Sequence, residues 1–336
     1  MRPTAYTRAS TLGPIADVVA ASGGSITRVF RRAELPLALL GAPDTLLPLR
    51  DHFGLLAQAA RELGDHAFGA RLGRQTTIAG LGIYGRWVTQ APTLLEAMDR
   101  ARLSLPHMLQ SATALTMRRV GSEVYWSYEP ADAATEGRPQ NEMLALWYMI
   151  AVARHFAGPR WLPSRVLVGG LPSGPKFGVG EQMGTETVTG DAPGAIVFGE
   201  QLLMAVNPKL GASAGLGAEE LARIFDIPAP HDLAGQVGVL IELGLLGGSI
   251  NLGDVVRKVG LSRRTLQRQL SGLGLSFADL LRDTRQRRAI ALLRGTECTI
   301  TEIAARLGYG DPAHFSRAFE RWSGMAPSRW RELASA

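Results

Sequence analysis

The last ninety or so residues of the chain repeat one pattern of apolar and polar positions. Apolar residues recur at intervals of three and four, which is typical of a helix with one buried face, and a glycine then interrupts them. The first copy has Leu252, Val255, Val256 and Val259 before Gly260. The second has Ile300, Ile303, Ala304 and Leu307 before Gly308. A second amphipathic stretch follows each glycine, with Leu266 and Leu270 or with Phe315 and Phe319. The sequence therefore predicts helix-turn-helix motifs at 251–271 and 299–321.

The helix starts in this region have their own signals. Thr299 with Glu302 forms a capping box, and Asn251 with Asp254 is a looser version of it. Helix-capping residues also precede the second helix of each motif, namely Ser262 and the pair Asp311-Pro312. Between the motifs, residues 277–293 predict one continuous helix of about 25 Å, capped by Ser276 and ended near Gly295.

The upstream part of the chain mixes helices and strands. Helical periodicity marks 53–63 and 94–105, alternation on either side of Gly121-Ser122 predicts a β-hairpin over 113–130, and an apolar helix follows at 141–156. Short strands are expected at 165–168 and 195–198, with a Gly/Pro-rich loop over 169–194 between them. The two prolines of 227–231 indicate a linker. We therefore expect an α+β domain at 1–228 and an all-α domain at 232–336.

Charge is divided unevenly along the 336 residues. Residues 251–336 contain 15 Lys and Arg against 8 Asp and Glu, whereas residues 1–250 contain 21 against 22. A basic domain attracts phosphate polyanions, which favours double-stranded DNA as the partner of the repeated motifs. Cys298 is the single cysteine, so no disulfide framework is possible. The longest apolar stretch, 143–153, is about half of a membrane span, and no signal peptide is evident, so we expect a cytoplasmic protein without a membrane partner.

Candidate base-reading residues follow from the buried face of each second helix. With Leu266 and Leu270 inward, the outward side chains are Arg263, Arg264, Gln267 and Arg268. Arginine can grip guanine and glutamine can grip adenine with paired hydrogen bonds. The outward set of the second copy is poorer in donors: Pro312, Ala313, Ser316 and Arg317. An ordinary solvated helix face is the alternative for both sets.

Arginines on the helix between the motifs are candidate phosphate contacts. We single out Arg285 and Arg287, which lie beside Arg282 and Arg288 in the sequence. The alternative for this group is salt bridging to Asp279 and Asp283, which stand at helical spacing from them.

At these residues the chain resembles the AraC/XylS family of bacterial transcription regulators. The matching segments are "LSRRTLQRQL", "GLSFADLLRDTR", "ITEIAARLGYGDPAHFSRAFERWSG" and "APSRW". The resemblance implies a seven-helix domain in which two helix-turn-helix motifs are joined by a linker helix. It supports Arg264, Gln267 and Arg268 as base readers in the first motif, and in the second motif it supports Pro312, Ala313, Ser316 and Arg317. Departures from the family pattern are small: Gln286 stands where the family usually has an apolar residue of the linker helix, and His314 takes a position that varies. Pro312 and Ala313 offer no side-chain donor.

The upstream part resembles the ligand-binding domain of one AraC-type subfamily. The segments that carry this resemblance are "LGDHAFGARLG", "GLGIYGRWVTQAPTLLEAM" and "PRWLPSRVLVGGLP". It implies a module that senses a small-molecule effector and forms dimers, and it adds RNA polymerase as a partner of an activator. Neither the effector nor its contact residues follow from it. Five aromatic residues could line a pocket, although a plain core is the commoner role: Tyr125, Trp126, Tyr128, Trp147 and Tyr148.

The sequence offers little support for an enzymatic function. Ser173 and Lys176 fit a serine-enzyme spacing, but the companion motifs are missing. Cys298 lies inside the repeated region, where a catalytic role is unexpected, and Cys and His have no metal-ligand spacing. We expect a non-enzymatic regulator without cofactor or metal. The alternative is a small-molecule-processing enzyme with a DNA-tethering C-terminal domain.

Overall fold

The structure is a computed structural model that describes residues 5–131, 136–170, 178–190, 192–211, 216, 227–229, 231–248 and 250–335. The chain forms two compact units, residues 5–227 and 228–336. The division between Ile227 and Pro228 falls within the linker predicted at 227–231. Among the described residues, no helix combines the length and apolar content needed to cross a membrane.

A five-stranded sheet organises the N-terminal unit, in the order β3-β4-β7-β5-β6. All pairs are antiparallel except β5 with β6. The strands are β3 Thr113–Val120, β4 Glu123–Pro130, β5 Arg165–Gly169, β6 Glu186–Gly190 and β7 Gly194–Gly199. The predicted hairpin is confirmed, with Gly121 at φ 60° in its turn. This α+β architecture is the predicted one.

The loop predicted over 169–194 was wrong in part. A short helix, α8 Val179–Met183, and the edge strand β6 lie within that range. Strand β6 pairs on one side only and alternates threonine with exposed Glu186 and Val188. Because it buries only Thr189, its sequence has no apolar alternation from which a strand could be recognised.

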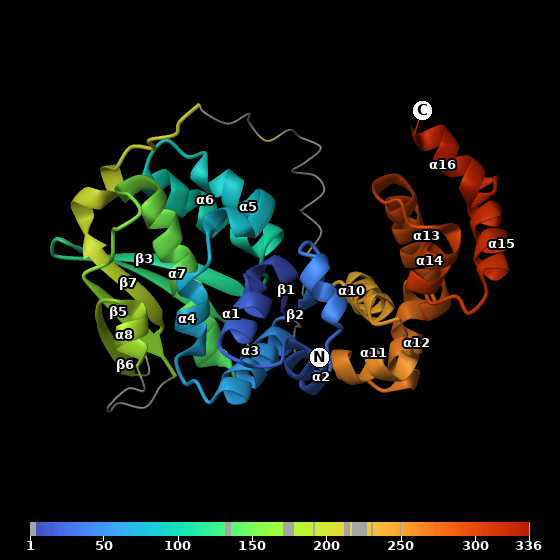
Figure 1. The fold of residues 1–336 in the computed structure, drawn as a ribbon, viewed down its shortest axis with the longest axis horizontal. Coiled ribbons are helices and arrows are strands. Elements are labelled where there is room, and N and C mark those ends of the chain that lie inside the picture. The colour runs from blue at the N-terminus through green and yellow to red at the C-terminus, as the bar shows by residue number, and fades with distance from the viewer. Residues whose placement is uncertain are drawn as a thin grey trace. The chain divides into compact units, whose positions relative to one another are not determined.

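Helices cover the sheet and complete the N-terminal unit. Figure 1 shows the long helix α7 (Arg138–Ala157) lying against the sheet, where it contacts β4, β5 and β7. The other helices are α1 Ile15–Ala21, α2 Ile26–Arg32, α3 Leu49–Leu63, α4 Phe68–Arg74, α5 Gly82–Thr89 and α6 Leu94–Met108. Short 3-10 turns are η1 Ala9–Leu12, η2 Leu37–Gly41, η3 Ile78–Leu81 and η4 Glu200–Met204, and β1 Tyr6–Arg8 pairs with β2 Leu46–Pro48. The helices expected at 53–63, 94–105 and 141–156 are confirmed by α3, α6 and α7.

Glycine allows α4 to approach α7 closely. A methyl group on Gly69 would overlap the backbone carbonyl of Gln140, and one on Gly73 would overlap the side chain of Trp147. The Gly69 N–H also donates to Gln140 Oε1 at 2.7 Å. These close contacts fix α4 and α7 against each other.

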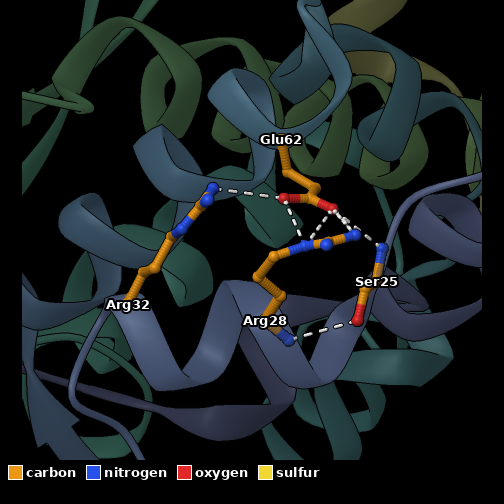
Figure 2. A network of polar contacts seen from close by, with 4 residues as sticks. All are labelled: Ser25, Arg28, Arg32 and Glu62. Carbon is orange, nitrogen blue, oxygen red and sulfur yellow. Dashed lines mark hydrogen bonds and ion pairs between the residues drawn. The ribbon is translucent and has the colours of Figure 1, made fainter.

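An ion-pair network ties α2 to α3, and Figure 2 shows its four residues. The Glu62 carboxylate accepts hydrogen bonds from Ser25 N at 3.1 Å, Arg28 Nε at 2.9 Å and an Arg32 guanidinium nitrogen at 3.2 Å. Hydrogen bonds from Arg28 and Ser25 lower the pKa of Glu62, so the carboxylate stays charged. The network fixes the start of α2, where the Ser25 side chain caps the helix.

Seven helices form the described part of the C-terminal unit, as the family resemblance implied. They are α10 Leu233–Leu246, α11 Leu252–Val259, α12 Arg263–Gly272, α13 Phe277–Gly295, α14 Ile300–Arg306, α15 Pro312–Ser323 and α16 Pro327–Ser335. One apolar core joins α10, α11 and α12, and a second joins α14 and α15. Helix α13 contributes to both cores, and Figure 1 shows it beside α14. The two motifs therefore share one linker helix.

The turn glycines and caps of this unit adopt the predicted roles. Gly260 and Gly308 take φ values of 68° and 71°, the left-handed region that a side chain disfavours. Each predicted capping side chain accepts a hydrogen bond from a backbone N–H of its helix: Asn251, Ser262, Ser276, Thr299 and Asp311. We call the second helix of each motif, α12 or α15, its recognition helix, and both recognition helices begin at defined residues.

Candidate nucleic-acid interface and a cavity of the N-terminal unit

Helix α12 presents the donor-rich face that its sequence predicted. Leu266 and Leu270 are fully buried in the first core. The four predicted readers, Arg263, Arg264, Gln267 and Arg268, are all exposed. The geometry therefore brings three guanidinium groups and one amide together on one surface of one helix, available to base edges or phosphates.

Helix α15 offers fewer free donors. Ser316 is half-buried, and its hydroxyl donates to the Pro312 carbonyl at 3.0 Å within the helix. Ala313 is exposed but apolar, and its N–H is used by the Asp311 cap at 2.8 Å. Arg317 is the exposed cation of the predicted set. The two recognition helices are unequal in hydrogen-bonding capacity, as their sequences indicate.

The linker-helix arginines have different surroundings. Arg282 pairs with Asp279 at 2.7 Å, so the salt-bridge alternative holds for this residue. Arg288 lies 3.8 Å from Glu242 of α10 and is mostly buried. Arg287 is exposed. Of the two residues predicted to contact phosphate, Arg287 is the one whose side chain reaches solvent freely.

Arg285 points into the protein. Its Nε donates to the Leu307 carbonyl at 2.9 Å, a terminal nitrogen donates to the Gly308 carbonyl at 3.1 Å, and the guanidinium stacks 4.5 Å from the Tyr309 ring centre. These carbonyls stand at the C-terminal end of α14, where backbone dipoles favour a cation. Arg285 therefore joins the linker helix to the second motif, a role that its sequence position alone did not reveal.

A basic groove runs between α13 and α15. It has a volume of about 840 Å³, and Arg282, Arg285, Arg317 and Arg321 line it together with Tyr309 and Trp322. Glu320 is the carboxylate among its lining residues. Sequence reasoning did not single out Arg321, although helical spacing places it four positions after Arg317. Positive charge thus extends from the second recognition helix to the linker helix.

The N-terminal unit contains a partly open cavity of about 60 Å³. Its wall comes from the sheet, from α3, α5, α6 and α7 and from the turns η1 and η3, and none of the described residues that line it is an Asp, Glu, Lys or Arg. Trp126, Tyr128 and Tyr148 line it, whereas Tyr125 and Trp147 do not. Tyr125 instead stacks with Arg118 at 5.0 Å on the hairpin surface. Three of the five aromatic candidates therefore meet around one space.

Polar groups in the cavity wall are neutral. The Tyr128 hydroxyl accepts hydrogen bonds from Gln110 Nε2 at 2.5 Å and Asn141 Nδ2 at 2.8 Å. Burial raises the pKa of Tyr128 to about 12 and lowers the pKa of His52 to about 4. His52, Gln110 and Asn141 come from separate segments, so no local sequence pattern could have marked them.

The residues weighed for catalysis gain no support. Ser173 and Lys176 lie outside the described residues. Cys298 is half-buried beside the second core, and its carbonyl accepts a hydrogen bond from Arg331 at 2.6 Å. These contacts are those of a packing residue at the end of the linker.

Both units match models of known protein families. Residues 23–206 match the family model described as the arabinose-binding domain of AraC transcription regulator, N-terminal, and residues 255–333 match a helix-turn-helix domain model. The chain belongs to the AraC family of transcriptional regulators. This AraC-family chain is 27% identical to the ornithine utilization regulator of Pseudomonas aeruginosa, over 98% of this chain and 96% of that protein.

Two further comparisons cover most of this AraC-family chain. It is 26% identical to the HTH-type transcriptional regulator VirS of Mycobacterium tuberculosis, over 96% of each chain. Among solved structures, the transcriptional regulator CdpR of Pseudomonas aeruginosa matches at 23% identity and a TM-score of 0.38, over 79% of this chain and 86% of that one.

Proposed function

We propose that this chain is a one-component regulator in which an effector-sensing domain, residues 1–228, controls a DNA-binding domain, residues 232–336, that reads two adjacent major grooves. One observation carries the proposal: two capped recognition helices with exposed polar faces are joined by a single continuous helix. The 19 residues of α13 rise about 28 Å, close to the roughly 34 Å between successive major-groove faces on one side of a duplex.

The two helices would contribute unequally to base reading. Arg264, Gln267 and Arg268 on α12 have the side-chain geometry for direct readout of guanine and adenine, and Arg263 extends the same exposed face. Among the predicted readers on α15, Arg317 is the charged donor, while Pro312 and Ala313 present apolar surface suited to thymine methyl groups. Phosphate contacts from Arg287 and from the basic groove would supply sequence-independent affinity.

The family of the N-terminal unit and its cavity support control by a small molecule. A second copy of the chain and RNA polymerase are further partners in this proposal, and both rest on the resemblance to AraC-type regulators. The names of the full-length relatives support regulation over the alternative of a tethered enzyme.

Base-by-base substitution of a selected operator tests the proposal. Arg268→Ala should weaken binding by about 1–3 kcal/mol and relax preference at one position of the site. Arg317→Ala, on the second helix, serves as the matched variant and should affect positions about one helical turn away. Uniform weakening across all sequences by both variants would make these residues phosphate contacts and would contradict base reading.

A further inference from the structure

We propose that the cavity of the N-terminal unit is the effector site and that it takes a small, uncharged, mostly apolar molecule carrying one hydrogen-bond acceptor. This inference rests on the proposed function, because it names the ligand class of the sensing domain. It goes beyond the family assignment, which leaves the ligand open.

The residues of the cavity wall indicate that the ligand is uncharged. Eighteen of the residues that the structure describes line the cavity, and none of these is an Asp, Glu, Lys or Arg. His52 is the one lining side chain that could become a cation, and burial lowers its pKa to about 4, so it is neutral near pH 7. A carboxylate or ammonium group placed here would lose its hydration without gaining an opposite charge, which is costly in an apolar surrounding.

Glu142 is a buried carboxylate on α7, next to the lining residue Asn141, and it does not alter this conclusion. It is not among the lining residues. Arg138 Nε donates to it at 2.9 Å and Gly169 N–H donates to it at 3.0 Å. The carboxylate is therefore satisfied by these partners and is unavailable to an ammonium ligand in the cavity.

The acceptor on the ligand follows from two hydroxyl groups. Tyr148 lines the cavity, and its hydroxyl is buried and has no hydrogen-bond partner. A buried hydroxyl left unpaired is unfavourable, so a ligand that accepts its proton gains that missing bond. The Tyr128 oxygen already accepts two N–H groups, which leaves its own proton to donate. Both hydroxyls can therefore donate a hydrogen bond to an acceptor on the ligand, such as a carbonyl or ether oxygen.

The size and position of the cavity complete the description. At about 10–15 Å³ for each water, about 60 Å³ corresponds to roughly four to six waters, the size of one small ring or short chain. The wall joins α6 and α7 to the strands β3 and β4, through residues such as Leu105, Leu115 and Val152. A bound molecule would therefore contact the sheet and the helices that cover it at once.

The test uses the full-length protein and three probes that share a six-membered ring: cyclohexanone, cyclohexylamine and cyclohexanecarboxylate. Calorimetric titration at pH 7 should show one cyclohexanone bound per chain, at least tenfold more tightly than either charged probe. Equal or tighter binding of a charged probe, or no binding of cyclohexanone, would overturn the inference.

Two variants locate the site. Tyr148→Phe should weaken cyclohexanone binding about fivefold, the loss expected for one hydrogen bond, whereas Tyr125→Phe, outside the cavity on β4, should leave it unchanged. Ala145→Leu, which fills the cavity, should weaken binding at least tenfold. Wild-type affinity of Tyr148→Phe for cyclohexanone would refute the Tyr148 hydroxyl as the hydrogen-bond donor. Because Tyr148→Phe removes only that hydroxyl and keeps the ring, it still tests the site if Ala145→Leu does not fold.

Operator binding by the same preparations separates the two proposals. A protein that binds its operator specifically but not cyclohexanone would overturn the cavity assignment alone. A protein that binds cyclohexanone as described but no DNA sequence specifically would overturn the proposed function.

Discussion

Replacing Arg285 by alanine should loosen the second helix-turn-helix motif from the linker helix. The change removes two hydrogen bonds from a cation to backbone carbonyls, at 2.9 and 3.1 Å, and a stacking contact with Tyr309. A hydrogen bond to a charged group contributes about 1.5–3 kcal/mol, and a cation over an aromatic ring about 0.5–2 kcal/mol. The freed carbonyls at the end of α14 can regain water, so we expect the free energy of unfolding of this unit to fall by about 2–3 kcal/mol.

Arg287→Ala is the matched control, two residues away on the same helix. Because Arg287 is exposed, its replacement should change unfolding by less than about 0.5 kcal/mol. If it contacts a phosphate, the slope of log K against log salt should fall by about 0.9. Urea unfolding and operator binding at several salt concentrations measure both quantities. A reduced salt slope with unchanged stability in Arg285→Ala would refute the inward role of that residue.

Two further predictions concern the fold. Gly69→Ala should destabilise the N-terminal unit by about 3 kcal/mol, because the new methyl group overlaps the Gln140 carbonyl; Gly54→Ala, also helical but facing open space, should stabilise it by about 0.5–1 kcal/mol in the same denaturation assay. The hydrogen bonds from Thr299 lower the pKa of Glu302, so the stability that its carboxylate gives α14 is present at neutral pH and is lost as pH falls below about 4.5. Glu302→Gln should make unfolding less sensitive to pH in that range, and an unchanged pH profile would contradict the capping role.

Much of the C-terminal unit could be predicted because its signals are local. Capping residues, turn glycines and helical periodicity lie within a few residues of the structure they specify, so the element bounds and the exposed faces of α12 and α15 followed directly. The contacts of Arg285 did not, because Leu307 and Gly308 lie more than twenty residues away. Among the five arginines of α13, nothing local distinguishes Arg285, which contacts the end of α14, from Arg287, which is exposed.

The N-terminal unit was less predictable for two physical reasons. Strand β6 lies at the sheet edge, with threonines on its inner face and Glu186 and Val188 exposed, so it lacks apolar alternation. The cavity is assembled from segments as distant as Thr11 and Val152. Aromatic residues on β4 and α7 could be proposed as a group, but only the tertiary structure separates Tyr148, which lines the cavity, from Trp147 beside it.

The number of major grooves that one chain occupies tests the central claim most directly. Methylation interference at guanine N7, on an operator selected by the full-length protein, reports contacts in the major groove. We predict two clusters about one helical turn apart on one face of the duplex, with Arg268→Ala removing interference in one cluster and Arg317→Ala in the other. A single cluster sensitive to both substitutions would contradict the account.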